Sequence, residues 1–290
     1  MIAWLLAPLS YQFMQRGMLV AVLVGIACAV MGCYVVLRSM AFIGDAISHS
    51  ILPGVAVAYL VKGNLLVGAL AAAIAVALGI GFFSRQGRLK EDSAIGILFA
   101  AAYSLGVILI SSIRTYAVDL SHILFGNVLG VSVTDLVLTA GLVVIVLLVV
   151  FLLYKELLVV SFDPVLAATL RLPAERLRIV ILLLLALTVV VSLQSVGIGL
   201  VTSMLVTPGA TAYLLTRRLP RMMAISALVG ALSSVIGLYA SYYLNVVSGA
   251  AIVLTSTGFF LLAYLFAPGR GMLWKLLRRR PTDPASPRPS

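Results

Sequence analysis

Residues 179–216 have the sequence IVILLLLALTVVVSLQSVGIGLVTSMLVTPGATAYLLT, without a single charged side chain. About 20 apolar residues cross a bilayer as a helix, so this run is too long for one span. Near its middle, the polar and glycine-containing segment Gln194–Gly197 favours a turn. The run therefore predicts a tight hairpin of two membrane helices.

The same pattern continues over the rest of the chain. A second long run, 222–269, is divided by Asn245-Val246-Val247-Ser248-Gly249 and predicts another hairpin. Residues 40–61 form one span that contains two ionisable side chains. Four further uncharged runs are each long enough for one span: 17–37, 63–84, 93–113 and 136–154. We expect an all-α, polytopic membrane protein of nine transmembrane helices, or of eight if the first two spans share one broken element.

The composition excludes the soluble classes of protein. Of the 290 residues, 63% are hydrophobic and only 10% are charged, and the mean hydropathy is +1.20. A soluble domain is about 45–50% apolar and about 25% charged. Because the ratio of surface to volume limits burial, no soluble domain of this size hides so much apolar surface. A soluble enzyme and a disordered or fibrous chain are therefore excluded.

The basic residues indicate the orientation in the membrane. The net charge is +11, from 20 Lys and Arg against 9 Asp and Glu. In a soluble protein this charge would indicate that the protein binds nucleic acid. In a membrane protein, cationic residues instead gather in cytoplasmic loops. We therefore expect contact with lipid and no nucleic-acid partner. Apart from Arg16, Lys62 and Arg114, every Lys and Arg lies in the segments 38–39, 85–92, 155–178, 217–221 and 270–290. These segments, and with them the C-terminus, are expected to be cytoplasmic.

The domain organisation is simple. Residues 1–277 are expected to form a single transmembrane domain, and 278–290 a basic, Pro-rich, disordered cytoplasmic tail. In the cytoplasmic segment 155–178, Asp163 can cap a helix and Pro164 suits its first position. This pattern predicts a short amphipathic helix at the cytoplasmic membrane surface.

Asp45 and His49 are the most informative pair in the chain. Four residues apart in a helix, they lie on one face, and an ionisable group at membrane depth is costly unless it is paired or lines a wet cavity. A carboxylate and an imidazole can together bind a divalent transition metal ion. Ser48 adds a polar atom to the possible pathway. A structural Asp–His hydrogen bond and a proton relay are the alternatives to a metal site.

A second polar group lies in the long uncharged run 179–216. Thr202, Ser203 and Thr207 carry hydroxyls and Pro208 breaks the helix, so this segment can line a pathway. The equally favoured alternative is that small and hydroxyl residues only allow close helix packing. His122, in an outer loop, is expected to be a solvated residue. No phosphate-binding loop of the Walker type and no Ser-His-Asp order is visible, so the chain is not expected to be an enzyme or to hydrolyse ATP.

Several segments resemble the permease subunits of manganese, zinc and iron ABC importers. The resemblance begins with RSMAFIGDAISHSILPG at 38–54 and extends over roughly residues 15–270. Its other segments are EDSAIG at 91–96, LFGNVLG at 124–130, QSVGIGLVTSMLVTPGATAYLLT at 194–216 and SGAAIV at 248–253. Several long motifs in the right order make the match specific.

The resemblance implies a permease fold of the type II ABC importers and a homodimer around a central pathway. It also implies a cytoplasmic ATPase partner that hydrolyses ATP, and an extracytoplasmic metal-binding protein that delivers the ion. The metal ion is then a substrate, with no permanently bound cofactor, and the protein lies in the cell (plasma or inner) membrane. Asp45 and His49 match the metal-contacting pair of the family without departure.

Residues 162–171 are similar to the family's coupling helix, which docks on the ATPase. The residues expected to make this contact are Phe162, Asp163, Pro164, Ala168, Leu170 and Arg171. Arg171 replaces a glycine common in that stretch, which leaves the details of docking open.

The leading interpretation is a permease of an ATP-driven importer for Mn(II), Zn(II) or Fe(II), with Mn(II) favoured. LVTPGATAYLLT resembles the manganese/iron branch of the family slightly more than the zinc branch. A metal-chelate or cobalamin permease is one alternative, which would need a wide pathway and no Asp–His pair. A proton-coupled secondary transporter is another, although it predicts inverted repeats and the sequence has no convincing internal repeat. The sequence leaves open which metal is carried, which residues form the gate and on which side the N-terminus lies.

Overall fold

The computed structural model describes residues 8–85, 89–112, 128–162, 164–267 and 272, and these residues form an all-helical bundle without a strand. The helices begin and end as follows: η1 Pro8–Ser10, α2 Gln12–Leu37, α3 Ile43–Ser50, α4 Leu52–Leu60, α5 Leu65–Phe83, α6 Glu91–Ser111, η3 Val128–Gly130, α8 Val133–Leu152, α9 Tyr154–Phe162, α10 Pro164–Thr169, α11 Ala174–Val196, α12 Ile198–Leu215, α13 Leu219–Leu244 and α14 Ser248–Phe266.

The number of spans agrees with the expectation of eight or nine. In the described part of the chain, eight helices are long and apolar enough to cross a membrane, with α3 and α4 counted together as Ile43–Leu60. The ninth, α12, is apolar but shorter, and Pro208 lies inside it. The choice between eight and nine therefore depends on α12 and not on the first two spans.

Both predicted breaks are confirmed. Gly197, with φ 83°, separates α11 from α12, and Asn245, with φ 53°, ends α13. Glycine adopts positive φ without a steric penalty, and asparagine tolerates it better than most residues. The prediction that α11 and α12 form a tight hairpin is wrong, because α12 turns away from α11 and packs mainly on α2 and α14.

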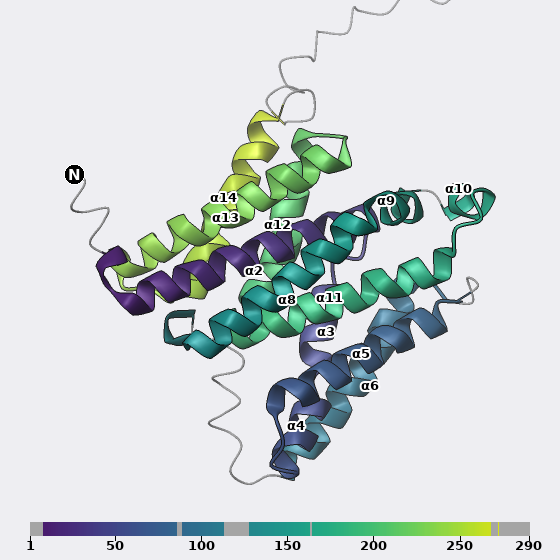
Figure 1. Cartoon of the computed structure of the whole chain (residues 1–290), viewed down its shortest axis with the longest axis horizontal. Coiled ribbons are helices and arrows are strands. Elements are labelled where there is room, and N and C mark those ends of the chain that lie inside the picture. The colour runs from purple at the N-terminus through teal and green to yellow at the C-terminus, as the bar shows by residue number, and fades with distance from the viewer. Residues whose placement is uncertain (1–7, 86–88, 113–127, 163, 268–271, 273–290) are drawn as a thin grey trace, which may run out of the picture.

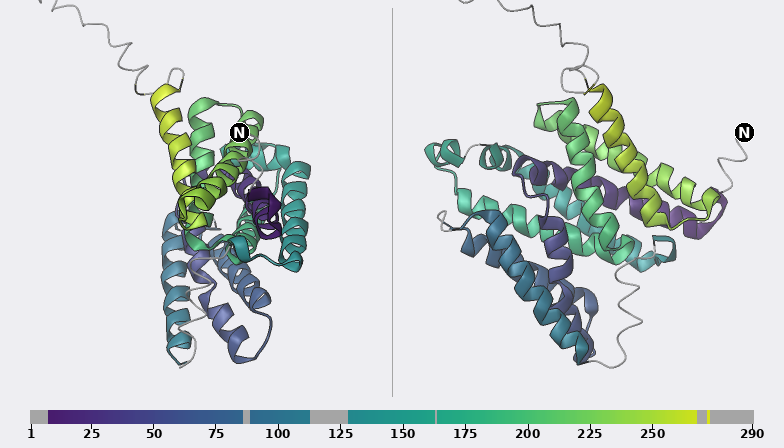
Figure 2. Two further views of the ribbon diagram at one scale, coloured as in Figure 1. Left: turned by 90° about the vertical axis from the view of Figure 1, so that its left-hand side faces the viewer. Right: turned by 180° about the vertical axis from the view of Figure 1, so that it is seen from behind.

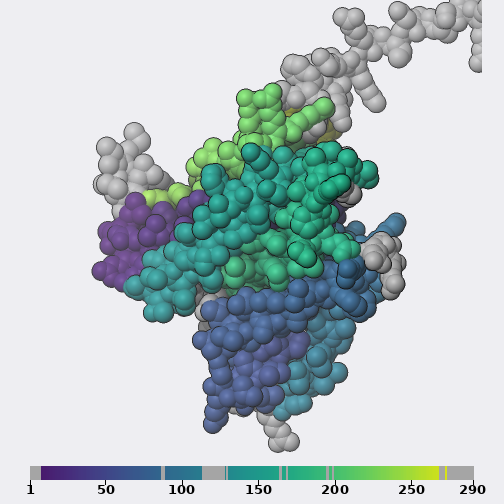
Figure 3. Space-filling view, turned by 45° about the vertical axis from the view of Figure 1, so that its right-hand side comes forward, coloured from purple at the N-terminus to yellow at the C-terminus, as the bar shows by residue number. Residues whose placement is uncertain are grey.

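The bundle has α2 near its centre (Figure 1). Helices α12 and α13 pack on one side of α2, with α14 outside them, and α8 and α11 lie on the other side. Beyond α11, the group α3–α6 forms a second block, seen in blue in the space-filling view (Figure 3). The linker from α2 into α3 connects the block around α2 to the block α3–α6. Helix α3 contacts α6, α11 and α12.

Small residues set the closest helix contacts. A Cβ at Gly25 would lie 2.9 Å from the backbone oxygen of Gly230, so α2 and α13 touch through their backbones. Gly54 and Gly68 bring α4 and α5 together in the same way. Ser226 Oγ of α13 donates to Ala29 O of α2 at 2.8 Å. Small and hydroxyl residues in these helices therefore serve close packing, as is usual in membranes.

The described parts of the segments expected to be cytoplasmic gather at one end of the bundle (Figures 1 and 2). Arg38 bonds to Glu91 there, and Arg85 Nε lies 2.8 Å from Glu175 Oε2. Arg178 of α11 donates to Ser84 O and Gly81 O, the terminal carbonyl groups of α5. A cation at a helix C-terminus complements the helix dipole. The bonds of Arg85 and Arg178 join the end of α5 to the start of α11, and Arg38–Glu91 joins the end of α2 to the start of α6.

Candidate metal centre

Asp45 and His49 lie on α3, the short helix that follows the linker from α2. Ile51 keeps helical dihedral angles between α3 and α4, and Pro53 lies in the first turn of α4, where its missing N–H costs nothing. Ser48 and Ser50 are buried, and each hydroxyl donates to the carbonyl oxygen four residues earlier, at 2.8 and 2.6 Å. The hydroxyl of Ser48 is thus used within the helix, and its role in lining a pathway stays a prediction.

The two side chains are brought together as the spacing predicts. His49 Nε2 lies 3.6 Å from Asp45 Oδ1, and the side chains are 27% and 50% exposed. This distance is longer than a good hydrogen bond. The two side chains therefore face one another without a direct hydrogen bond of ordinary length.

Two aromatic rings of α6 enclose the imidazole. The centroid of His49 lies 5.8 Å from that of Tyr103, at an interplanar angle of 90°, and 6.1 Å from that of Phe99. His49 Nδ1 is buried and has no hydrogen-bond partner among the described residues. The sequence reasoning missed both rings. The only signal was their spacing of four residues within an uncharged run.

The hydroxyl residues of α12 divide into two groups. Thr202 lies near α3. A Cβ placed on Gly44 of α3 would lie 3.9 Å from the Cα of Thr202. Ser203 and Thr207 are half-buried on the same helix, which packs closely on α2 through Gly32 and Leu205. The helix therefore serves close packing, and a pathway role for these three hydroxyls stays a prediction.

The segment similar to a coupling helix, 162–171, contains the last residue of α9 and the short helix α10, at the end of the bundle that carries the basic residues (Figure 1). Phe162 ends α9 with its side chain 54% exposed, and Leu170 follows α10 with 55% exposed. Pro164 and Ala168 lie in α10, and Asp163 lies outside the described residues. Arg171 has φ 54°, in the left-handed region that favours glycine.

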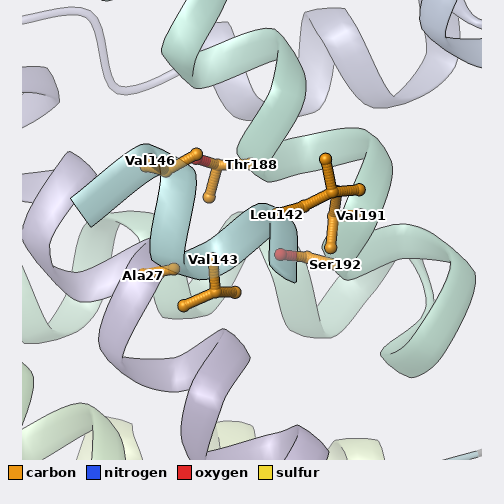
Figure 4. Close-up of a pocket in the computed structure, with 7 residues that line it drawn as sticks. All are labelled: Ala27, Leu142, Val143, Val146, Thr188, Val191 and Ser192. Carbon is orange, nitrogen blue, oxygen red and sulfur yellow. The ribbon is translucent and has the colours of Figure 1, made fainter. Parts of the chain in front are cut away.

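A recess of about 340 Å³ adjoins this segment. It is lined by Leu37, Phe162, Tyr213, Thr216, Arg217, Leu219 and Met222. A crevice between α2, α8 and α11 has no room for a water molecule (Figure 4). It is a packing defect and not a binding site.

The described part of one chain offers only a pair of ligands. It contains no group of three or more His, Cys, Asp and Glu side chains that could hold a metal ion. A complete coordination shell for an ion at Asp45 and His49 therefore needs other donors, such as water or a second chain. His122 and the tail 278–290 lie outside the described residues.

Comparisons with known proteins agree with this architecture. The chain is 50% identical over 93% of its length, and 92% of the relative, to the manganese transport system membrane protein MntC of Halalkalibacterium halodurans. It is 40% identical to a probable iron transport system membrane protein of Haemophilus influenzae, over 92% of this chain and 98% of that protein. A chain of PsaBC from Streptococcus pneumoniae, solved in complex with Fab, is 39% identical with a TM-score of 0.83, over 96% of this chain and all of that one. Residues 10–267 match the model of the ABC 3 transport family, and the chain belongs to that family.

Proposed function

We propose that this chain is the membrane permease subunit of an ATP-driven importer for divalent transition metal ions, with Mn(II) as the favoured cargo. The observation that carries the proposal is the pair Asp45–His49, with Oδ1 and Nε2 3.6 Å apart on one helix face. Both side chains are partly exposed in the single chain. An ionisable pair in a membrane helix is a functional site by default because of its cost.

The choice of metal rests on ligand chemistry and on the relatives. Carboxylate oxygen suits Mn(II), and imidazole suits Zn(II) and Fe(II). The two relatives above are named for manganese and for iron. Mn(II) is therefore favoured, with Fe(II) or Zn(II) as the other candidates. Few protein ligands are an advantage for transport, since an ion that is held too tightly is not released.

Membership of the family supports the remaining parts of the proposed transporter. Two copies of the chain would form the pathway and together offer two Asp–His pairs to the ion. An extracytoplasmic metal-binding protein would deliver the ion. A cytoplasmic ATPase would dock on Phe162–Arg171 and hydrolyse ATP, so this chain is not itself an enzyme. Alternating access would follow from movement of this segment, with the C-terminus on the cytoplasmic side of the cell membrane.

The exposed side chains of α10 support the docking role. Val165 is 76% exposed and Leu166 is 46% exposed, at the end of the bundle where the basic residues gather. Ala167, between them and the bundle, is fully buried. A short helix that is buried on one side and apolar on the other is suited to contact a partner protein.

Transport in proteoliposomes tests the proposal. The chain is reconstituted with its metal-binding protein, with and without its ATPase, and the uptake of radiolabelled Mn(II) and Zn(II) is measured with and without ATP. Uptake that needs both the ATPase and ATP supports the importer. Uptake without the ATPase identifies a secondary transporter instead. Uptake of a metal chelate in preference to the free ion would identify a chelate permease.

A further inference from the structure

The orientation of the His49 ring needs an explanation. A histidine that binds a metal through one nitrogen usually donates a hydrogen bond from the other, and this bond fixes the ring. In His49, Nε2 faces Asp45, so Nδ1 is the nitrogen that would make the orienting bond. Within the described part of the chain, Nδ1 is buried and has no hydrogen-bond partner. Among the described residues, no hydrogen bond to Nδ1 therefore fixes the orientation of the imidazole.

The aromatic rings of Phe99 and Tyr103 lie beside the imidazole of His49. Their centroids lie 6.1 and 5.8 Å from that of His49, and 5.9 Å from each other. All three distances lie within the range in which aromatic rings attract. Tyr103 meets the imidazole at 90°, the edge-to-face arrangement that is favoured over a face-to-face sandwich. Rotation of the imidazole away from Asp45 would give up both contacts.

Helix α6 is fixed to the site helix on both sides of these rings. At its start, Glu91 bonds to Arg38, in the linker that leads into α3. Beyond Tyr103, a Cβ at Gly106 would lie 2.6 Å from Leu52 Cβ and 3.1 Å from Pro53 Cδ. Since α6 contacts the chain before α3 and the start of α4, its backbone is held close to α3 on both sides of Phe99 and Tyr103.

We propose that Phe99 and Tyr103 are positioning residues of the metal site. They act through His49, whose imidazole they hold with Nε2 toward Asp45 Oδ1, ready to bind a divalent transition metal ion. The inference rests on the proposed function of the Asp45–His49 pair. Loss of either ring leaves the imidazole free to rotate, so the cost falls on the affinity for the ion and not on the turnover of the filled transporter.

The chain contains a matched control for this proposal. Phe260 and Tyr264 on α14 have the same residue types and the same spacing, with ring centroids 6.2 Å apart. No histidine lies beside this pair, because His49 is the only histidine in the described part of the chain. The variants Phe99→Leu, Tyr103→Leu and Tyr103→Phe are therefore compared with Phe260→Leu and Tyr264→Leu. Each is reconstituted with the ATPase and the same amount of the metal-binding protein, and size-exclusion profiles report whether it is folded.

The readout is the separation of KM from maximal rate in ATP-dependent Mn(II) uptake. Phe99→Leu and Tyr103→Leu are expected to raise KM about tenfold, the upper range of an aromatic pair interaction, with little change in maximal rate. Tyr103→Phe keeps the ring and is expected to restore the KM of the unaltered protein. The two α14 variants are expected to leave KM unchanged. If one leucine variant does not fold, the other carries the test.

Two results overturn the proposal. One is an unchanged KM in both Phe99→Leu and Tyr103→Leu. The other is a fall in maximal rate alone, which would mean that the rings serve movement of α6. His49→Ala is measured beside them and separates this failure from that of the proposed function. Inactive His49→Ala with normal ring variants refutes positioning only, whereas normal uptake by His49→Ala refutes the metal site itself.

Discussion

Arg38 Nη2 donates to both carboxylate oxygens of Glu91, at 3.0 Å to Oε2 and 3.3 Å to Oε1. The two side chains are only 11% and 20% exposed. Burial lowers the pKa of the Arg38 guanidinium, and the Glu91 carboxylate beside it opposes this change. The ion pair joins the first turn of α6 to the linker before α3. It therefore fixes the start of α6 close to the linker that leads into the helix of Asp45 and His49.

Removal of one partner of this pair is expected to destabilise the fold. Glu91→Gln leaves the buried guanidinium without a counter-charge and should lower the free energy of unfolding by about 2 kcal/mol or more. Glu175→Gln is the control, because the Arg85–Glu175 pair is 59% and 47% exposed and an exposed pair contributes about 0–1 kcal/mol. Denaturant titration in detergent measures both, and equal effects would contradict a special role for Arg38–Glu91.

The contact between α2 and α12 depends on the absence of a side chain at Gly32. A Cβ there would collide with the backbone oxygen of Leu205. Gly32→Ala should therefore cost about 3 kcal/mol through overpacking. At Gly258 of α14 nothing lies within 4 Å of the same position, and Gly258→Ala should stabilise the helix by about 0.5–1 kcal/mol. The thermal unfolding midpoint is expected to fall for Gly32→Ala and to rise for Gly258→Ala. A Gly32→Ala protein of unchanged stability would show that α2 and α12 do not touch as described.

Arg171 follows α10 with φ 54°. A side chain in the left-handed region costs about 1–2 kcal/mol, so Arg171→Gly should raise the unfolding free energy by up to about 1 kcal/mol. Arg176 lies in helix α11 and is exposed, so Arg176→Gly should lower it by about 1 kcal/mol. The two variants remove the same charge, and a fall in stability for both would show that charge and not backbone conformation decides the effect.

The ends of the helices could be predicted from the sequence, but their partners could not. Charged residues delimit the spans, and Gly197 and Asn245 supply the backbone conformations that end α11 and α13. The predicted pairing of α11 with α12 failed because both helices are apolar on all sides and hydropathy does not choose a neighbour. The choice is made by small residues far apart in the sequence, such as Gly32 against Leu205.

The residues of the candidate site could likewise be predicted only in part. Asp45 and His49 were identified because their spacing is local and ionisable side chains are rare in a membrane helix. Phe99 and Tyr103 were missed, since an aromatic residue in an apolar run has the same pattern whether it faces lipid or a histidine. Only the packing of α6 on α3 distinguishes these two situations.

The central claim is that Asp45 and His49 bind the metal ion during transport. The most direct test is ATP-dependent uptake of radiolabelled Mn(II) by proteoliposomes that contain the ATPase and either the unaltered chain, Asp45→Ala or His49→Ala. Loss of an outer partner of a metal ligand alone costs about 10- to 100-fold, so loss of a ligand should reduce uptake at low Mn(II) by more than about 100-fold. Normal uptake by both folded variants would contradict the claim and leave Asp45 and His49 a structural role only.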